Sequence, residues 1–148
     1  MFRKILVPED FNDLARRPLE IAAELARAGG GTVVLFSVVD DSFPNPDIMS
    51  FQLPWADYHR HLRDEAVGRL EEMKRLHGGG AAIEVVVVRG QPARAIVEFS
   101  NAEKCDLIVL ATHGTSGFHH ALVGSVTRKV IHHATCPVMV VRLPAAER

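Results

Sequence analysis

A stretch that combines glycines and hydroxyl side chains after an apolar run is the part of this sequence best suited to chemistry. The apolar run 107–111 is long enough for a buried parallel strand, and it leads through Gly114 to Gly124-Ser125, where a helix is expected to begin. Glycines let the backbone approach an anion closely, and the free N–H groups of a helix start supply donors and a partial positive charge. Ser125 and Thr127 add hydroxyl donors. The stretch therefore predicts a phosphate-binding loop.

A turn between a strand and a helix gives a second explanation for the same residues. Gly114 is typical of such a turn and Ser125 of a helix N-cap, so either residue alone is compatible with a structural role. Together they favour phosphate binding. The sequence contains no Gly-x4-Gly-Lys-Ser/Thr motif and no Gly-x-Gly-x2-Gly after a strand, which argues against a Walker-type ATPase and a dinucleotide-dependent dehydrogenase.

Carboxylates after the first apolar run form a second group of candidates. Asp10 precedes Asn12 and Asp13, so it either organises the turn before a helix or contacts a ribose or a metal ion. Its neighbour Glu9 either repels phosphate groups or helps to hold a Mg²⁺ that bridges them. In the loop itself, His113 either donates to a phosphate or supports the loop.

The remaining reactive side chains give little support for catalysis or zinc binding. The sequence Gly114-Thr115-Ser116-Gly117 is not the Gly-x-Ser-x-Gly motif of a serine hydrolase. The adjacent pair 132–133 of histidines points about 100° apart on a helix and cannot chelate one ion. We therefore predict neither a catalytic nucleophile nor a structural zinc site.

Composition indicates a single domain, residues 1–148. The chain has 148 residues, 47% of them hydrophobic, which is enough for one core. A net charge of −1 and a content of one Trp and one Tyr argue against nucleic-acid binding. No apolar run approaches the roughly 20 residues of a membrane span, and the start of the chain does not have the pattern of a signal peptide. Cys105 and Cys136 fit no disulfide framework, so we expect a cytoplasmic protein.

Hydrophobic patterning predicts an α/β fold with a parallel sheet. Helical patterns alternate with strand-like runs, and the runs at 33–36 and 85–88 are apolar at every position, as expected when helices cover both faces of a sheet. The expected strands are 3–8, 32–39, 82–88, 106–111 and 137–142. The expected helices are 13–28, 55–77, 92–103 and 124–134. Ligands of such sheets collect at the carboxyl ends of the strands.

The spacing Ala111-x2-Gly114-x9-Gly124-Ser125 resembles the Gly-x2-Gly-x9-Gly-Ser/Thr signature of ATP-binding members of the universal stress protein family. Ala111 stands where that signature opens with glycine. Three further segments carry the likeness along most of the chain. They are Lys4 to Pro8 with Asp10 (first strand and Pro-x-Asp end), Gly90-Gln91-Pro92 (Gly-x-Pro turn) and 136–141 (closing strand).

The resemblance implies a Rossmann-like, doubly wound open sheet of five parallel strands in the order 3-2-1-4-5, with helices on both faces. It also implies ATP as the ligand, together with Mg²⁺ or Mn²⁺. Asp10 matches the aspartate of the nucleotide site and is the candidate metal ligand, and Val38 matches a residue that borders the adenine. With His113 from the loop, the candidate nucleotide site consists of Pro8, Asp10, Val38, Ala111, His113, Gly114, Gly124, Ser125, Val126 and Thr127.

As a function, the resemblance implies a dimeric stress-response regulator or nucleotide-dependent interaction module rather than a fast enzyme. The closing strand 137–142 is expected at a sheet edge, where two copies pair as a homodimer. The segment 41–55 has three prolines and six large apolar side chains and is expected to be, in order of preference, a lid near the nucleotide, a dimer contact or a client-binding patch. Two alternatives stay open: slow ATP hydrolysis or autophosphorylation at Ser125 or Thr127, and a nucleotide-free dimeric interaction module.

Overall fold

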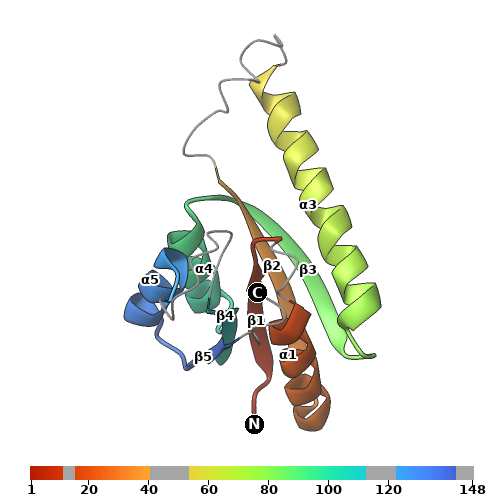
Figure 1. Cartoon of the computed structure of the whole chain (residues 1–148), viewed down its shortest axis with the longest axis vertical. Coiled ribbons are helices and arrows are strands. Elements are labelled where there is room, and N and C mark those ends of the chain that lie inside the picture. The colour runs from red at the N-terminus through yellow and green to blue at the C-terminus, as the bar shows by residue number, and fades with distance from the viewer. Residues whose placement is uncertain (12–15, 41–53, 113–122, 143–148) are drawn as a thin grey trace.

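The computed structural model contains one five-stranded parallel sheet in the order β3-β2-β1-β4-β5, which confirms the expected doubly wound α/β fold (Figure 1). The structure describes residues 1–11, 16–40, 54–112 and 123–142. The strands are β1 (Lys4–Glu9), β2 (Thr32–Asp40), β3 (Ala82–Gly90), β4 (Leu107–Ala111) and β5 (Val138–Val141). The helices are α1 (Arg16–Gly29), α3 (Trp55–His77), α4 (Pro92–Ala102) and α5 (Ser125–His133).

Side chains alternate along each strand between two hydrophobic layers, one on each face of the sheet. On β1, Ile5 and Val7 join the layer covered by α1 and α3, whereas Leu6 joins the layer covered by α4 and α5. Figure 1 shows these helix pairs on opposite sides of the sheet. Helices on both faces explain why the runs 33–36 of β2 and 85–88 of β3 are apolar at every position.

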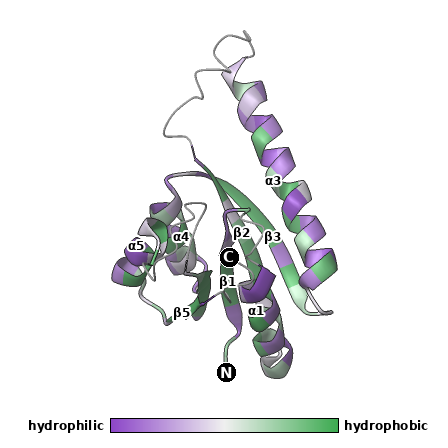
Figure 2. Cartoon of the chain, in the orientation of Figure 1, coloured by the Kyte–Doolittle hydropathy of each residue, from purple (hydrophilic) through white to green (hydrophobic). Residues whose placement is uncertain are grey.

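Helix α3 reaches well beyond the sheet. Its buried residues, Ala66 and Leu70, lie in the half that covers the sheet, while Trp55 at its start is 42% exposed. Figure 2 shows mostly hydrophilic residues along the exposed part of this helix, and Figure 1 shows its start projecting past the end of β2. The first turns of α3 therefore lie over the carboxyl ends of the strands rather than over the core.

The strands extend slightly further at their carboxyl ends than the sequence predicts. Pairing of β2 with β3 continues without a break to Asp40↔Gly90, and β1 includes Glu9. The backbone at Gly90 then takes a φ of 151°, which favours glycine, and the strand ends there. Cys105 and Cys136 are both free, in agreement with the sequence. None of the described helices is both long enough and apolar enough to cross a membrane.

Candidate functional site

The order of the strands reverses between β1 and β4, and the candidate residues gather at this point. The two strands pair in register through Ile5↔Leu107 and Leu6↔Ile108, so their carboxyl ends reach the same edge of the sheet. Asp10 follows one strand and Ala111 ends the other. In open α/β sheets this edge, at the reversal of strand order, is where ligands bind.

The start of α5 is fixed beside the end of β4 by two hydrogen bonds. The backbone N–H of Gly124 donates to the carbonyl oxygen of Thr112 at 2.8 Å. The hydroxyl of Thr127, which is 5% exposed, donates to the carbonyl oxygen of Ala111 at 3.1 Å. A threonine hydroxyl has one proton to donate, so Thr127 can offer a ligand its backbone N–H but not this proton.

The first turn of α5 presents backbone donors at this edge. The first intrahelical bond of α5 runs from the N–H of Arg128 to the carbonyl of Gly124, so the N–H groups of Ser125, Val126 and Thr127 have no acceptor within the helix. Gly124 is the N-cap, with φ −57° and ψ 158°, and supplies no side-chain cap. The turn thus combines orphan donors with the positive end of the helix dipole, an arrangement suited to an anion.

Ser125 has a different place from the N-cap that its type suggests. It is the first residue of α5, one position after the N-cap Gly124, and its side chain is exposed. The structural explanation of Ser125 as a capping residue is therefore wrong for this helix. Its hydroxyl lies at the start of the turn that carries the orphan N–H groups.

Pro8 and Val38 lie on one face of the sheet. Pro8 pairs with Phe36 in the register of β1 and β2, and Phe36 and Val38 both belong to the layer covered by α4 and α5. Val38 is half-buried in that layer. Both residues therefore lie on the side of the sheet from which α5 approaches the edge.

Glu9 points to the opposite face. It continues the alternation of Ile5 and Val7, pairs with Ser37 and is 5% exposed. Neither carboxylate oxygen has a hydrogen-bond partner among the described residues. Burial raises the pKa of the Glu9 carboxyl well above its usual range, and the nearby charge of Asp10 raises it further. This carboxyl therefore favours its protonated form and lies away from the face of Pro8 and Val38.

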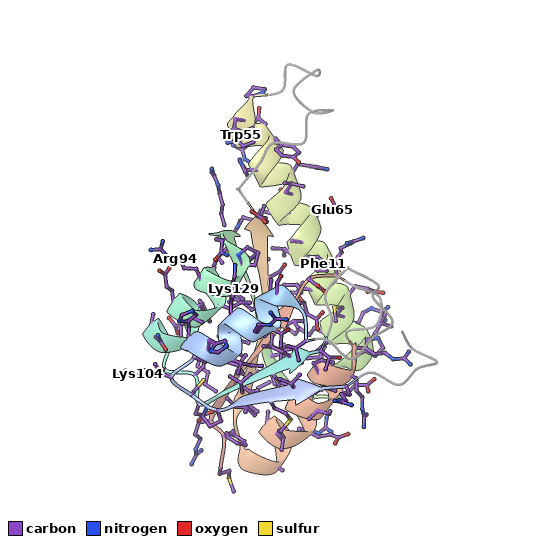
Figure 3. The ribbon with its side chains drawn as sticks, turned by 60° about the vertical axis from the view of Figure 1, so that its left-hand side comes forward. Phe11, Trp55, Glu65, Arg94, Lys104 and Lys129 are labelled. Carbon is purple, nitrogen blue, oxygen red and sulfur yellow. The ribbon has the colours of Figure 1, made fainter. Side chains whose placement is uncertain are left out.

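The chain turns sharply after Asp10 through a residue in the left-handed region. Phe11 has a φ of 60°, which is uncommon for a residue other than glycine, and its ring packs against the core under α1 and α3. The guanidinium of Arg69 lies 5.2 Å from the centre of that ring, and Figure 3 shows Phe11 beside α3. No sequence rule places a phenylalanine at a positive φ, so the sequence offers a turn after Asp10 but does not predict the backbone conformation of Phe11.

Two predicted site residues, His113 and Gly114, lie outside the described residues, as does the segment 41–53. Within the described part, no three His, Cys, Asp or Glu side chains come together to hold a metal ion. Asp10 is exposed at the edge of the sheet and is the carboxylate that follows β1 there.

A family model described as the universal stress protein family matches residues 1–142. This chain belongs to the universal stress protein family. Universal stress protein MJ0531 of Methanocaldococcus jannaschii is 33% identical over 149 residues, covering 99% of this chain and 86% of that protein. MJ0577 of the same organism is 30% identical, covering 96% of each chain.

Solved structures of universal stress proteins share the fold. The structure of MJ0577 superimposes with a TM-score of 0.81 at 30% identity, covering 97% of this chain and 98% of that chain. Two structures at 22% identity show the same fold with TM-scores of 0.66 and 0.60. The first, covering 97% of this chain and 98% of its own, is a universal stress protein in complex with cAMP. The second, covering 95% and 97%, is the universal stress protein of Archaeoglobus fulgidus in complex with dAMP.

Proposed function

We propose that this universal stress protein binds ATP at the carboxyl edge of β1 and β4 and acts as a nucleotide-dependent regulator. The observation that carries the proposal is the first turn of α5, whose backbone N–H groups at Ser125, Val126 and Thr127 have no acceptor within the helix. These donors and the helix dipole suit the phosphates of a nucleotide. Gly124, which has no side chain, lets the phosphates come close to the backbone.

The face that carries Pro8 and Val38 receives the adenine and ribose in this proposal. Both residues lie on the side of α4 and α5, so one ligand can contact them while its phosphates extend to the start of α5. Asp10 follows β1 and provides a carboxylate for the ribose or for a metal ion. The nucleotides named in the structures of two relatives, cAMP and dAMP, support an adenine nucleotide in particular.

Magnesium fits this site as a companion of the phosphates rather than as an ion held by the protein alone. Mg²⁺ is usually bound by one or two carboxylates together with substrate phosphates. The described residues offer Asp10 at the edge, while Glu9 lies on the other face of the sheet. Mg²⁺ would therefore neutralise phosphate charge with Asp10 as its carboxylate, and Mn²⁺ would bind in the same way.

The proposed role is that of a cytoplasmic, dimeric stress-response module in which nucleotide occupancy is the signal. Edge strand β5 is apolar, which supports pairing of two copies there. We propose a regulator rather than a fast enzyme, because no sequence motif supplies a dedicated general base or a catalytic lysine. If autophosphorylation occurs, Ser125 is the better acceptor: it is exposed, whereas the Thr127 hydroxyl is buried and bonded to Ala111.

The test is to denature the purified protein and identify any released nucleotide by chromatography, and then to titrate nucleotide-free protein with ATP and GTP. Ligand at 100 times its dissociation constant adds about 2.7 kcal/mol of stability, so ATP with Mg²⁺ should raise the melting temperature by a few degrees and GTP by less. A melting curve that millimolar ATP leaves unmoved refutes ATP binding and favours the nucleotide-free module. Phosphate release above that of a Gly124→Val control indicates an enzyme instead.

A further inference from the structure

A small pocket lies between the first turns of α3 and the carboxyl ends of β2 and β3. Its cavity of about 310 Å³ has an apolar floor formed by Val39 and Val87. Val88 also lines it, although its side chain packs in the layer under α4 and α5. Val39 follows Val38 on β2 and so points to the other face of the sheet, where Val87 packs in the layer under α1 and α3. The pocket is thus separated by the sheet from the proposed adenine face.

The rim of this pocket is cationic. Among the described residues, Arg60, Arg63 and Arg89 line it and no carboxylate does, whereas three other pockets lined by described residues each include at least one glutamate. Within the described part of the chain Arg63 forms no ion pair. Arg60 lies 3.7 Å from Asp57, and both side chains are more than half exposed, so this pair is weak. The positive charge of Arg63, and in part that of Arg60, is therefore available to a ligand.

His59 adds a polar group that lacks a partner. It lines the same pocket, and both of its ring nitrogens are shielded from solvent without a hydrogen-bond partner among the described residues. The ring packs edge-on against Trp55, with 4.5 Å between ring centres and 85° between planes. A neutral imidazole has one N–H donor and one acceptor nitrogen. A ligand oxygen near the donor would supply the hydrogen-bond acceptor that this N–H lacks. His59 and Arg63 are four residues apart and lie on one side of α3.

We propose that this pocket binds a small organic anion, in which an apolar group rests on the valines and a carboxylate or phosphate head contacts Arg63, Arg60 and the His59 ring. The cavity is at the small end of ligand sites, which begin at about 300 Å³, and this size suits a single ring or a short branched chain. Guanidinium groups bind both heads through paired N–H donors. The site is distinct from the nucleotide site and does not depend on it.

The probes for this site are benzoate and phenyl phosphate, titrated into ¹⁵N-labelled full-length protein and followed by NMR. We expect millimolar concentrations of one or both to shift the amide signals of Val39, Val87 and Val88 and the ring signals of His59. The relative affinity of the two probes tells which head the pocket takes. Benzylamine has the same ring with a positive charge, and acetate has the carboxylate without the ring. Both should bind at least about tenfold more weakly than benzoate, because benzylamine lacks the negative head for the arginines and acetate lacks the ring for the valines.

Substitutions assign the binding to the named side chains. Arg63→Gln should weaken the better probe about tenfold, as expected for one charge-assisted contact, and Arg63→Lys should restore part of the loss. His59→Phe keeps a ring against Trp55 and should also weaken binding. The matched control is Arg75→Gln on the same helix, whose guanidinium pairs with Glu72 at 2.7 Å outside this pocket and whose loss should leave binding unchanged.

Several outcomes overturn the proposal. They are an absence of shifts with both anions, equal binding of benzylamine and benzoate, and affinities that Arg63→Gln leaves unchanged. Displacement of the anion by saturating ATP also overturns it, because the pocket would then be part of the nucleotide site. Simultaneous binding of ATP and benzoate supports two separate sites, and failure of ATP to bind leaves the anion result standing by itself.

Discussion

The hydroxyl of Thr127 donates to the carbonyl oxygen of Ala111 at 3.1 Å and so fastens the first turn of α5 to the last residue of β4. Together with the bond from the Gly124 N–H to the Thr112 carbonyl, this contact sets where the orphan donors of α5 lie. A phosphate site needs fixed donors, because flexible ones must be ordered when the ligand binds. Thr127 therefore serves the proposed site mainly by positioning the helix.

Replacing Thr127 by valine tests this anchor. The change keeps the shape of the side chain but removes the hydroxyl, so we expect the free energy of unfolding to fall by about 1 kcal/mol in urea denaturation. The control is Thr135→Val, which removes an exposed bond to Asn101 of 2.6 Å and should cost less than about 0.5 kcal/mol. Equal losses in the two variants would show that burial of the Thr127 bond has no special effect.

Replacing Ser125 by alanine separates ligand binding from helix capping. Because Gly124 is the N-cap, we expect the stability of the nucleotide-free protein to change by less than about 0.5 kcal/mol. ATP affinity should fall by about 1.5–3 kcal/mol if the hydroxyl donates to a phosphate. Calorimetric titration and apo melting curves measure the two quantities. Lost stability with unchanged affinity contradicts the phosphate role.

A methyl group at position 124 tests close approach of the phosphates. The backbone angles there, φ −57° and ψ 158°, are open to alanine, so Gly124→Ala adds no backbone strain. If phosphates contact this backbone, the added methyl should lower ATP affinity, and Gly124→Val should abolish binding. Wild-type affinity in Gly124→Ala places the phosphates elsewhere.

Much of this site can be predicted from sequence, because the strands and helices that build it follow from hydrophobic patterning and their order follows from the family resemblance. Continuous apolar runs predicted buried parallel strands, and the family resemblance predicted the strand order that brings Asp10 and Ala111 to one edge. Helix boundaries were predicted to within one or two residues for α4 and α5. The predicted roles of His113 and Gly114 lie outside the described residues and stay predictions.

What sequence did not predict depends on contacts between distant elements. The exact register of β1 decides that Glu9 faces the layer under α1 and α3, and a shift of one residue would reverse it. Likewise, the four-residue spacing of His59 and Arg63 marks one side of a helix but does not say that this side meets the ends of β2 and β3. Ser125 is a favoured capping type, yet Gly124 takes the cap position.

Glu9 should make the stability of the protein depend on pH. Its folded-state pKa is raised, so the native protein holds this proton more tightly than the unfolded chain does, and stability falls as pH rises from about 4.5, the unfolded value, towards the folded pKa. The loss reaches at most about 1.4 kcal/mol per pH unit and then levels off above the folded pKa. Glu9→Gln removes the titrating group, so the variant should gain stability relative to wild type as pH rises. Urea unfolding at several pH values measures this, and parallel wild-type and variant curves contradict it.

The two edges of the sheet differ in a way that predicts which one pairs. Edge strand β3 carries the exposed charges Glu84 and Arg89, whereas β5 reads Val-Met-Val-Val and has none. Charged side chains on an edge disfavour pairing with another chain, and an apolar edge invites it. We therefore expect a homodimer through β5 in solution.

Val140→Glu and Met139→Arg place a charge on β5 and should shift the dimer towards monomer in light scattering. Met139 packs against the core, so circular dichroism must first show that its variant is folded, and Val140→Glu gives an independent measurement. The control is Glu84→Arg on β3, which alters a charge at the opposite edge and should leave the dimer mass unchanged. A monomeric wild-type protein, or a dimer that survives both β5 variants, rules out this interface. Dissociation by Glu84→Arg alone would place the contact on β3.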